Sequence, residues 1–269
     1  MSSRASAPRV WTRDRAAHDR NYVRFYTLGS LEIWKGGREC ALRTPKVLQV
    51  LGMLLVRANR TVPTESMLEE LWGENPPRSA LTTIQTYIYQ LRRLIEREGL
   101  ADAESMLATQ APGYVLRVDP EQLDLEQFWI LRRQGLECFR TGDHEDASHL
   151  LRGALNLWTE RPLANVRLGS VLEVYVTDLQ EQYRNTLQFA IESEMALGLH
   201  RDLIGELRSL TSKYPLDEWF YQQLMRALER SGRRSDALRV YRILQSTLSE
   251  ELGIDPSAES HKLYCELLR

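Results

Sequence analysis

The pattern of apolar residues changes near residue 120, and this change constrains the fold more than any other feature of the chain. Before it, short runs rich in aromatic and β-branched residues alternate with segments of helical spacing. From Asp124 to the end, only helical spacing is present, and the breaks fall at glycines and prolines. These breaks lie at Gly142, Pro162, Gly198, Pro215, Gly232 and Pro256. The sequence therefore predicts a mixed domain followed by an all-α domain.

Three parts follow from this pattern. Residues 1–21 form a polar arm that contains five arginines, and we expect the arm to be flexible in isolation. Residues 22–120 form the mixed domain, and residues 121–269 form the all-α domain. The arm either adds contacts to phosphate groups or is only a solvated leader, and the sequence leaves both open.

Short strands and helices follow one another in the mixed domain. Three short segments joined by tight turns, at 22–28, 31–34 and 39–42, predict a small antiparallel sheet. Helices are expected from Thr44-Pro45 to Ala58, from a cap at Thr64 to Trp72, and from about Ser79 to Glu98. Residues 106–109 and 114–118 predict a hairpin. A small sheet, three helices and a terminal hairpin are the elements of a winged helix-turn-helix domain.

The third of these helices has one apolar and one polar face. The apolar stripe, which we expect to point inward, consists of Leu81, Ile84, Ile88, Leu91 and Ile95. The polar face carries Thr82, Thr86, Tyr89 and Arg93, flanked by Gln85, Gln90 and Arg97. Such side chains can bond base edges or phosphates in the major groove of B-DNA. An ordinary solvated helix face has a similar composition, so the helix alone favours DNA binding only slightly.

The all-α domain contains a degenerate internal repeat. Gly198 and Gly232 are 34 residues apart, and each is followed by apolar residues at similar positions. This is the period of tetratricopeptide repeats (TPR), so the sequence predicts a TPR-like helical array. The fold class is therefore mostly α with a small β part. Aromatic residues in the array are predicted to pack between helices, although a ligand groove remains an alternative.

The charge of the chain is unevenly distributed. The formal net charge is -2, but residues 1–120 carry 17 basic and 13 acidic residues, and residues 121–269 carry 18 and 24. A uniformly basic nucleic-acid binder is excluded by this composition. Any DNA binding has to rely on a few placed cations and on helix ends. We therefore expect weak binding by a monomer and dependence on tandem sites.

The sequence contains no constellation for catalysis, cofactor binding or metal binding. His144 and His149 are five residues apart, which places them about 140° apart around a helix rather than on one zinc-binding face. Three widely spaced cysteines fit a reducing compartment. The longest nearly apolar run, Val47–Val56, contains Gln49 and Gly52 and is about half of a membrane span. We expect a cytoplasmic protein that has no enzyme activity, cofactor or membrane partner.

Several long segments, in the same order along the chain, resemble the SARP family, the Streptomyces antibiotic regulatory proteins. In the mixed domain they are Arg24-Phe25, Leu28–Glu32, Leu54–Val62, Glu70–Pro77, Leu81–Leu94 and Pro112–Val118. In the all-α domain they are Ala237–Arg242 and Glu250–Pro256. The resemblance runs from about residue 23 to the C-terminus. It implies an OmpR-type winged helix followed by a TPR-like bacterial transcriptional activation domain.

The resemblance also implies a function. Members of the family activate clustered biosynthetic genes, commonly those for antibiotics. They bind direct repeats in promoter DNA near the -35 region as head-to-tail pairs of identical chains, and they recruit RNA polymerase, including its sigma factor. The alternative that remains open is a TPR-type protein-interaction adaptor whose winged helix binds protein rather than DNA.

Residues of this chain that match the family's motifs take on expected roles. The expected DNA-binding residues are Lys46, Thr82, Gln85, Thr86, Tyr89, Gln90, Arg92, Arg93 and Arg97. Of these, Lys46, Arg92 and Arg93 are expected at phosphates, and Lys46 is helped by the positive end of its helix. The loop at residues 73–79 resembles the loop that contacts the polymerase. Its expected contact residues are Trp72, Glu74, Asn75 and Arg78.

Overall fold

The computed structural model describes residues 22–269, and these residues form two compact units. The first unit comprises the described residues up to Glu137 together with His149–Gln188. The second comprises Cys138–Ser148 and Phe189–Arg269. The predicted arm, residues 1–21, lies outside the described residues.

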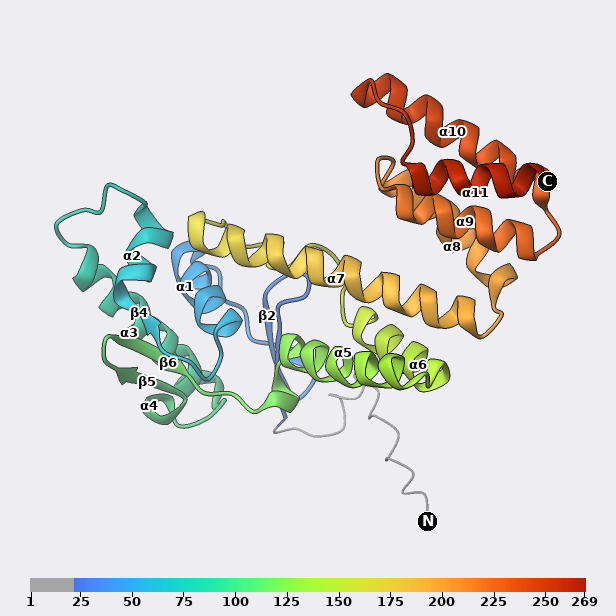
Figure 1. Cartoon of the computed structure of the whole chain (residues 1–269). Coiled ribbons are helices and arrows are strands. Elements are labelled where there is room, and N and C mark those ends of the chain that lie inside the picture. The colour runs from blue at the N-terminus through green and yellow to red at the C-terminus, as the bar shows by residue number, and fades with distance from the viewer. Residues whose placement is uncertain (1–21) are drawn as a thin grey trace, which may run out of the picture. The chain divides into compact units, whose positions relative to one another are not determined.

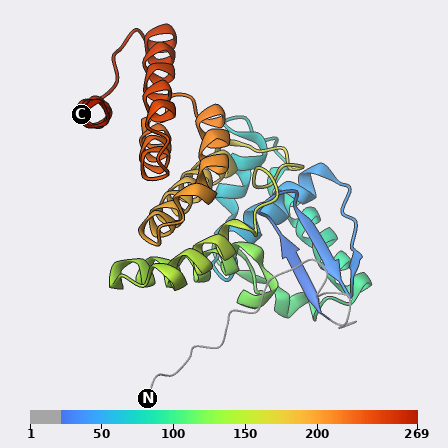
Figure 2. The same cartoon turned by 90° about the vertical axis from the view of Figure 1, so that its right-hand side faces the viewer.

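The first unit opens with the small sheet that the sequence predicts. Strands β1 (Val23–Tyr26), β2 (Glu32–Lys35) and β3 (Arg38–Glu39) pair antiparallel in that order (Figure 1). The turn between β2 and β3 is Gly36-Gly37, whose φ angles of 54° and 80° favour glycine. Figure 2 shows this sheet from a second direction.

Three helices and a second small sheet complete the winged helix-turn-helix. The elements are α1 (Pro45–Val56), β4 (Val62–Pro63), α2 (Thr64–Trp72), α3 (Ala80–Glu98), α4 (Ala103–Met106), β5 (Leu107–Gln110) and β6 (Gly113–Leu116). The second sheet has the order β4-β6-β5. A Cβ on Gly113 would lie 1.9 Å from the carbonyl oxygen of Val62, so only glycine allows β6 to pair with β4. The predicted hairpin and three helices are confirmed, and the short helix α4 is an element that the sequence pattern does not predict.

Two expectations about α2 and α3 are wrong in detail. Thr64 is the first residue of α2 rather than its cap, and its hydroxyl donates to the carbonyl of Pro112. Leu81 is 57% exposed, and Leu94 is buried together with the rest of the expected stripe of α3. At 100° per residue, Leu81 and Leu94 lie at opposite edges of that stripe. The core covers the Leu94 edge, and in the first turn of the helix it covers Ala80 but not Leu81.

After residue 120 the chain is helical, as predicted. A 3₁₀ turn, η2 (Pro120–Gln122), precedes α5 (Asp124–Thr141), α6 (His144–Leu155), α7 (Ser170–Ala196), α8 (His200–Lys213), α9 (Glu218–Arg230), α10 (Arg234–Leu252) and α11 (Ala258–Leu268). Gly142, Gly198 and Gly232 have φ angles of 81°, 82° and 75° and follow α5, α7 and α9. These left-handed positions end the helices as the glycine pattern predicts.

Successive helices of the second unit pack against one another. Helix α8 packs on α9, α9 on α10, and α10 on α11. Gly198 precedes the pair α8–α9 and Gly232 precedes the pair α10–α11, so the 34-residue spacing corresponds to one helical pair. The core between the helices contains Phe220, Leu224, Leu228, Ala237 and Leu244. The TPR-like array is therefore present in this unit.

The first unit extends across the change of pattern at residue 120. Its core is one cluster in which Phe25 and Leu51 join Phe128, Leu163 and Leu172. The segment before α7 also bonds the residues that follow β1: the N–H groups of Thr159, Leu163 and Ala164 donate to the carbonyls of Leu28, Thr27 and Gly29, respectively. The winged helix is thus completed by residues that lie far later in the sequence.

Asp124, at the start of α5, makes a second connection to β1. Its carboxylate is buried and accepts hydrogen bonds from the N–H and hydroxyl of Thr27 and from the N–H of Leu28. The N–H of Leu125 donates to the same carboxylate. Burial raises the pKa of Asp124 to about 6, although these hydrogen bonds act in the opposite direction.

Candidate nucleic-acid interface

Helix α3 presents the polar face that the sequence predicts. Its buried side chains Ile84, Ile88, Leu91, Leu94 and Ile95 anchor it on the core, so the opposite side faces solvent. The exposed residues of this face are Thr82, Gln85, Thr86, Tyr89, Gln90, Arg93 and Arg97. Seven of the nine expected DNA-binding residues therefore share one surface of one helix. We call these seven residues the α3 face.

The first three turns of the α3 face are polar but uncharged. The amides of Gln85 and Gln90 can each pair with adenine, with one donor and one acceptor. The hydroxyl of Thr86 donates to the carbonyl of Thr82 at 2.9 Å, so it keeps its lone pairs and its methyl group for other contacts. Tyr89 is 61% exposed. Base contacts made by this stretch would rest on neutral groups.

The arginines of the α3 face lie toward its C-terminal end. Arg93 is exposed and makes no hydrogen bond or ion pair with any residue in 22–269. Arg97 lies beside Glu98, with 3.0 Å between its Nε and Oε1 of the carboxylate. Because Arg93 has no internal partner among the described residues, its guanidinium is available to an anion such as a phosphate.

Arg92 lies at the edge of this face, but its side chain is bonded inside the protein. Its Nε donates to the carbonyl of Leu107 at 2.9 Å, and its Nη2 donates to the hydroxyl of Thr109 at 3.0 Å. An ion pair to Glu104 at 3.2 Å adds a third contact, and the Arg92 side chain is only 19% exposed. The guanidinium therefore joins α3 to the strand β5, and the structure gives it a positioning role.

Lys46 is also engaged inside the protein. Its Nζ donates to the carbonyl of Leu71 at 2.5 Å, near the C-terminal end of α2, and lies 5.9 Å from the ring centre of Trp72. Burial lowers the pKa of Lys46, and the charge of Arg167 lowers it further. A cation at this position stabilises the negative end of α2. Its ammonium group thus already has an internal partner.

Arg43 is a further candidate, which is not among the residues expected from the sequence. It is exposed, lies just before Pro45, the first residue of α1, and forms no hydrogen bond or ion pair with any residue from 22 to 269. Among the α-helices of the described part, α1 and α3 begin without an acidic residue in the first turn. The positive ends of these two helices are therefore not neutralised locally. The signal in the sequence is a basic residue placed directly before a helix start.

The loop between α2 and α3 lies at the surface. Gly73 has a φ angle of 61°, and Glu74, Asn75 and Arg78 are exposed. Trp72 is half-buried under the Lys46 side chain. The four expected polymerase-contact residues are thus accessible or partly accessible, as a contact loop requires.

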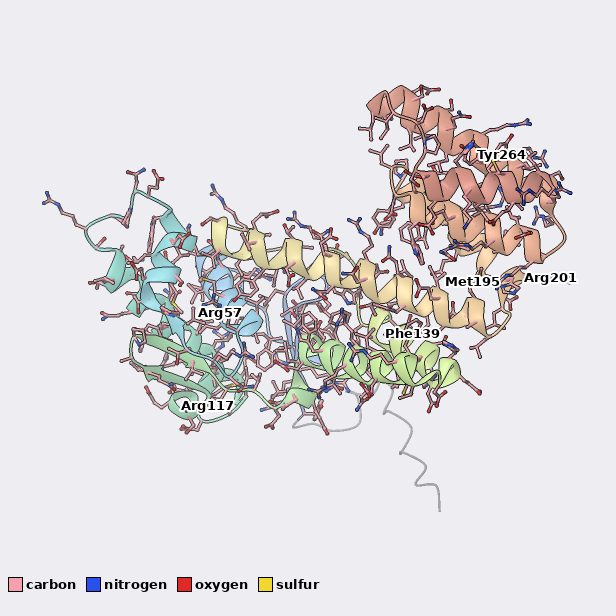
Figure 3. All side chains as sticks on the ribbon, viewed as in Figure 1. Arg57, Arg117, Phe139, Met195, Arg201 and Tyr264 are labelled. Carbon is pink, nitrogen blue, oxygen red and sulfur yellow. The ribbon has the colours of Figure 1, made fainter. Side chains whose placement is uncertain are left out.

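The hairpin β5–β6 has an uncharged tip. Residues 109–112 are exposed, and they are Thr, Gln, Ala and Pro. Arg117 follows β6, and its Nη1 donates to the carbonyl of Ser105 at 3.2 Å (Figure 3). The basic residue nearest to this hairpin in sequence is therefore bonded to a carbonyl of α4.

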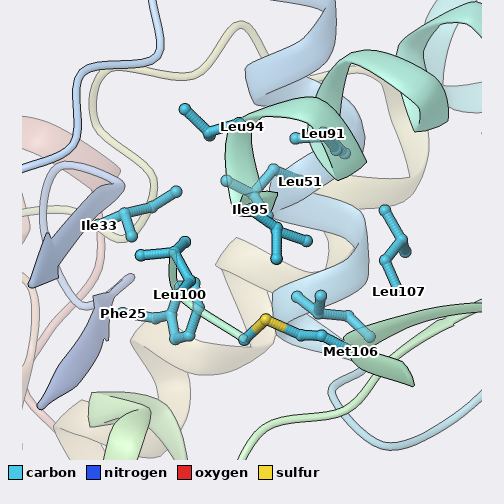
Figure 4. A pocket seen from close by; sticks show the side chains of 10 residues that line it. Phe25, Ile33, Leu51, Leu91, Leu94, Ile95, Leu100, Met106 and Leu107 are labelled. Carbon is cyan, nitrogen blue, oxygen red and sulfur yellow. The ribbon is translucent and has the colours of Figure 1, made fainter. Parts of the chain in front are cut away.

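The interior of the described residues provides little space for a small molecule near this interface. A cavity of about 10 Å³ lies beneath α3 and is lined only by apolar side chains, among them Phe25, Leu91 and Met106 (Figure 4). It has about the size of one water molecule and offers no polar partner. No group of three or more His, Cys, Asp or Glu residues within 22–269 is placed to hold a metal ion. No helix among these residues is both long and apolar enough to span a bilayer.

Several aromatic residues of the helical region pack against other elements, as predicted. In the first unit, the ring of Trp158 lies 5.3 Å from that of Phe128 and 4.9 Å from that of Tyr183. In the second unit, Tyr264 stacks on Tyr241 at 4.2 Å (Figure 3). These rings pack against one another, whereas Tyr221 lines a surface hollow of the second unit.

Comparison with known proteins places these features in a family. Residues 37–116 match the model described as "Transcriptional regulatory protein, C terminal", and residues 123–268 match the bacterial transcriptional activator domain. The chain is 37% identical over 246 residues to the regulatory protein DnrI of Streptomyces peucetius, covering 90% of each chain. It is 32% identical to the regulatory protein AfsR of Streptomyces griseus, but spans only 24% of that longer protein.

A solved structure supports the fold. The chain matches Mycobacterium tuberculosis EmbR in complex with a low affinity phosphopeptide with a TM-score of 0.85 and 34% identity, covering 92% of this chain and 65% of that one. The domains and relatives that match this chain are those of transcriptional regulators rather than of enzymes. The order of the two matched models, and the identity shared with nearly the whole of DnrI, show that the chain belongs to the SARP family of bacterial transcriptional activators.

Proposed function

We propose that this protein activates a biosynthetic gene cluster, such as one for an antibiotic, by binding direct repeats near the -35 element and recruiting RNA polymerase. Two chains bind head to tail on adjacent repeats. The α3 face enters the major groove, and Arg93 contacts a phosphate. The observation that carries the proposal is the exposed α3 face. Its uncharged residues suit contacts with base edges, and its unpaired Arg93 suits a contact with the DNA backbone.

The scarcity of free cations supports binding in pairs. Lys46 and Arg92 are occupied inside the first unit, and Arg97 is paired with Glu98. The exposed cations that remain at α3 and at the start of α1 are Arg93, Arg78 just before α3, and Arg43. Each phosphate contact adds to affinity through counterion release, so few contacts give weak binding by one chain. A second chain on a neighbouring repeat raises occupancy when the two copies touch, because the second binding step then occurs at high effective concentration.

The loop between α2 and α3 is the proposed contact with the polymerase and its sigma factor. It is exposed at Glu74, Asn75 and Arg78. Helix α2, which leads into it, is fixed to the start of α7 through Glu70. A loop held at its base in this way loses less conformational freedom when it binds a partner.

The experiment is a footprint on the promoters of the neighbouring genes, with and without RNA polymerase, followed by transcription in vitro. Fragments with two repeats, one repeat and scrambled repeats are compared at several salt concentrations. We expect protection of both repeats, much weaker binding to one repeat, and more transcript only from the intact promoter. Equal binding to scrambled DNA would overturn the proposal.

One observation keeps the adaptor function as a second candidate. A surface hollow of about 280 Å³ in the second unit is lined by Arg208, Tyr221, Leu224, Val240 and Ile243, and Ile243 is 57% exposed. A partner segment with an apolar side chain would fit such a hollow. Absence of any shift with promoter DNA at low salt, together with retained binding to the polymerase, would favour this function.

A further inference from the structure

Leu81 is the residue of α3 whose position differs most from the sequence expectation. It has the spacing of the buried stripe, yet 57% of its surface is exposed in the first turn of the helix. We infer that Leu81 is a specificity-determining residue that contacts the 5-methyl group of a thymine in the major groove. This inference rests on the proposed function and names one feature of the DNA that the function requires.

Its neighbours place Leu81 at the edge of the α3 face. Thr82 is the next residue, and Gln85 lies one turn further along the same side, 40° around the helix. Both neighbours are exposed. In helix-turn-helix proteins the N-terminal residues of the recognition helix contact base edges. The first turn also lacks an acidic residue, so nothing in it repels the phosphates on either side of the groove.

The chemistry of the side chain selects the partner. Leucine has no donor or acceptor, so it gains nothing from the oxygen and nitrogen atoms that edge the bases. The 5-methyl group of thymine is the apolar feature that the major groove of unmodified DNA presents. Other leucines of the chain are equally exposed, among them Leu252 at 52%, and single exposed leucines need no special explanation. Leu81 differs from them because it lies beside groups that suit base contacts.

The lack of cations around Leu81 makes an apolar contact with thymine more important for the choice of DNA sequence. Residues 80–91 contain no lysine or arginine, and Arg92 is bonded to the hairpin. The paired contacts of arginine with guanine are therefore not available to the first three turns. Discrimination there has to come from the amides of Gln85 and Gln90, from the threonines and Tyr89, and from apolar contact.

The test uses the full chain and the footprinted repeats with each thymine replaced in turn by deoxyuridine, which removes only the methyl group. At one thymine in each repeat, we expect the replacement to weaken wild-type binding about fourfold, as for one buried methyl-sized group. Leu81→Ala should bind the two DNAs equally, and Leu81→Met should keep part of the difference. Leu252→Ala is the matched control and should respond as the wild type does.

The outcomes separate the inference from the function on which it rests. The inference is overturned if Leu81→Ala is as sensitive to deoxyuridine as the wild type, or if the wild type is insensitive at every thymine. Neither result affects repeat-specific binding. Loss of all preference for repeats over scrambled DNA in the wild type overturns the proposed function as well. Thermal unfolding of Leu81→Ala should match the wild type, because the side chain is exposed.

Discussion

The carboxylate of Glu70, in the last turn of α2, accepts a hydrogen bond of 2.9 Å from the backbone N–H of Leu172 in the first turn of α7. The same carboxylate accepts from the N–H of Gly169 at 2.6 Å and from the amide of Gln49 at 2.7 Å. A side chain of the winged helix thus caps a helix that begins about one hundred residues later. The two domains predicted from the sequence are therefore joined by hydrogen bonds from the N–H groups at the start of α7, which have no partner within the helix.

We expect Glu70→Ala to destabilise the first unit by about 2–4 kcal/mol, because it leaves buried N–H donors without an acceptor. Chemical denaturation monitored by tryptophan fluorescence measures this change. Glu69→Ala is the matched control, since Glu69 is exposed and makes only a 3.3 Å contact to the Ser170 hydroxyl. Its effect should remain within about 0.5 kcal/mol. Equal effects of the two variants would contradict the capping role.

The raised pKa of Asp124 predicts that the contribution of this residue to the stability of the folded protein falls as the pH rises. Its pKa in the folded protein is raised to about 6 from an ordinary value of 3.8, so the folded state binds the proton more tightly than the unfolded state. The stabilisation from this proton is fully present below about pH 4 and is lost as the pH rises through 6. Relative to Asp124→Asn, the wild type should lose up to about 3 kcal/mol between pH 4 and pH 7.

Urea unfolding of both proteins across this pH range measures that difference, and other carboxyl groups cancel in the comparison. A difference that is flat or that grows with pH would show that the hydrogen bonds from Thr27, Leu28 and Leu125 outweigh burial. Asp124→Asn should also be destabilised at every pH, because its NH₂ group would face these N–H donors.

Arg92 and Arg93 are neighbours in sequence, but replacing each with alanine should affect DNA binding and stability differently. Arg93→Ala should weaken binding to all DNA sequences and reduce the slope of log affinity against log salt by about one unit, as expected for one lost phosphate contact. Arg92→Ala should leave that slope unchanged and lower stability by about 1–3 kcal/mol, because it removes the bonds to Leu107 and Thr109. Binding titrations at several salt concentrations, with thermal unfolding, separate the two. A smaller slope for Arg92→Ala would place its guanidinium on DNA instead.

Gln85 is expected to select a base rather than a phosphate. Gln85→Ala should relax the preference at one position of the repeat, at a cost of about 1–3 kcal/mol for the preferred base. Selection of binding sites from a random library measures the change. The salt slope should stay the same, in contrast to Arg93→Ala. An unchanged set of selected sites would contradict a base contact by Gln85.

Much of the fold follows from local sequence signals. The helix starts at Pro45 and near Ser79, and the breaks at Gly142, Gly198 and Gly232, depend on the backbone preferences of single residues, and these predictions are confirmed. The exposure of Leu81 was not predictable, because it depends on how far the core extends along α3. The internal bonds of Lys46 and Arg92 were missed for a similar reason. A pattern of charges does not reveal which cation meets a carbonyl from another element.

The bonding of the segment before α7 to the end of β1 has a consequence for synthesis on the ribosome. The carbonyls of Leu28, Thr27 and Gly29 accept from the N–H groups of Thr159, Leu163 and Ala164, respectively, and the cap on α7 forms only when Leu172 is made. About 50 residues separate the end of the winged-helix segment from Leu172, a delay of several seconds at ordinary rates of translation. During this interval a nascent chain lacks part of the core beneath its recognition helix. Truncated products that end within α5 or α6 would therefore be poor competitors for the promoter.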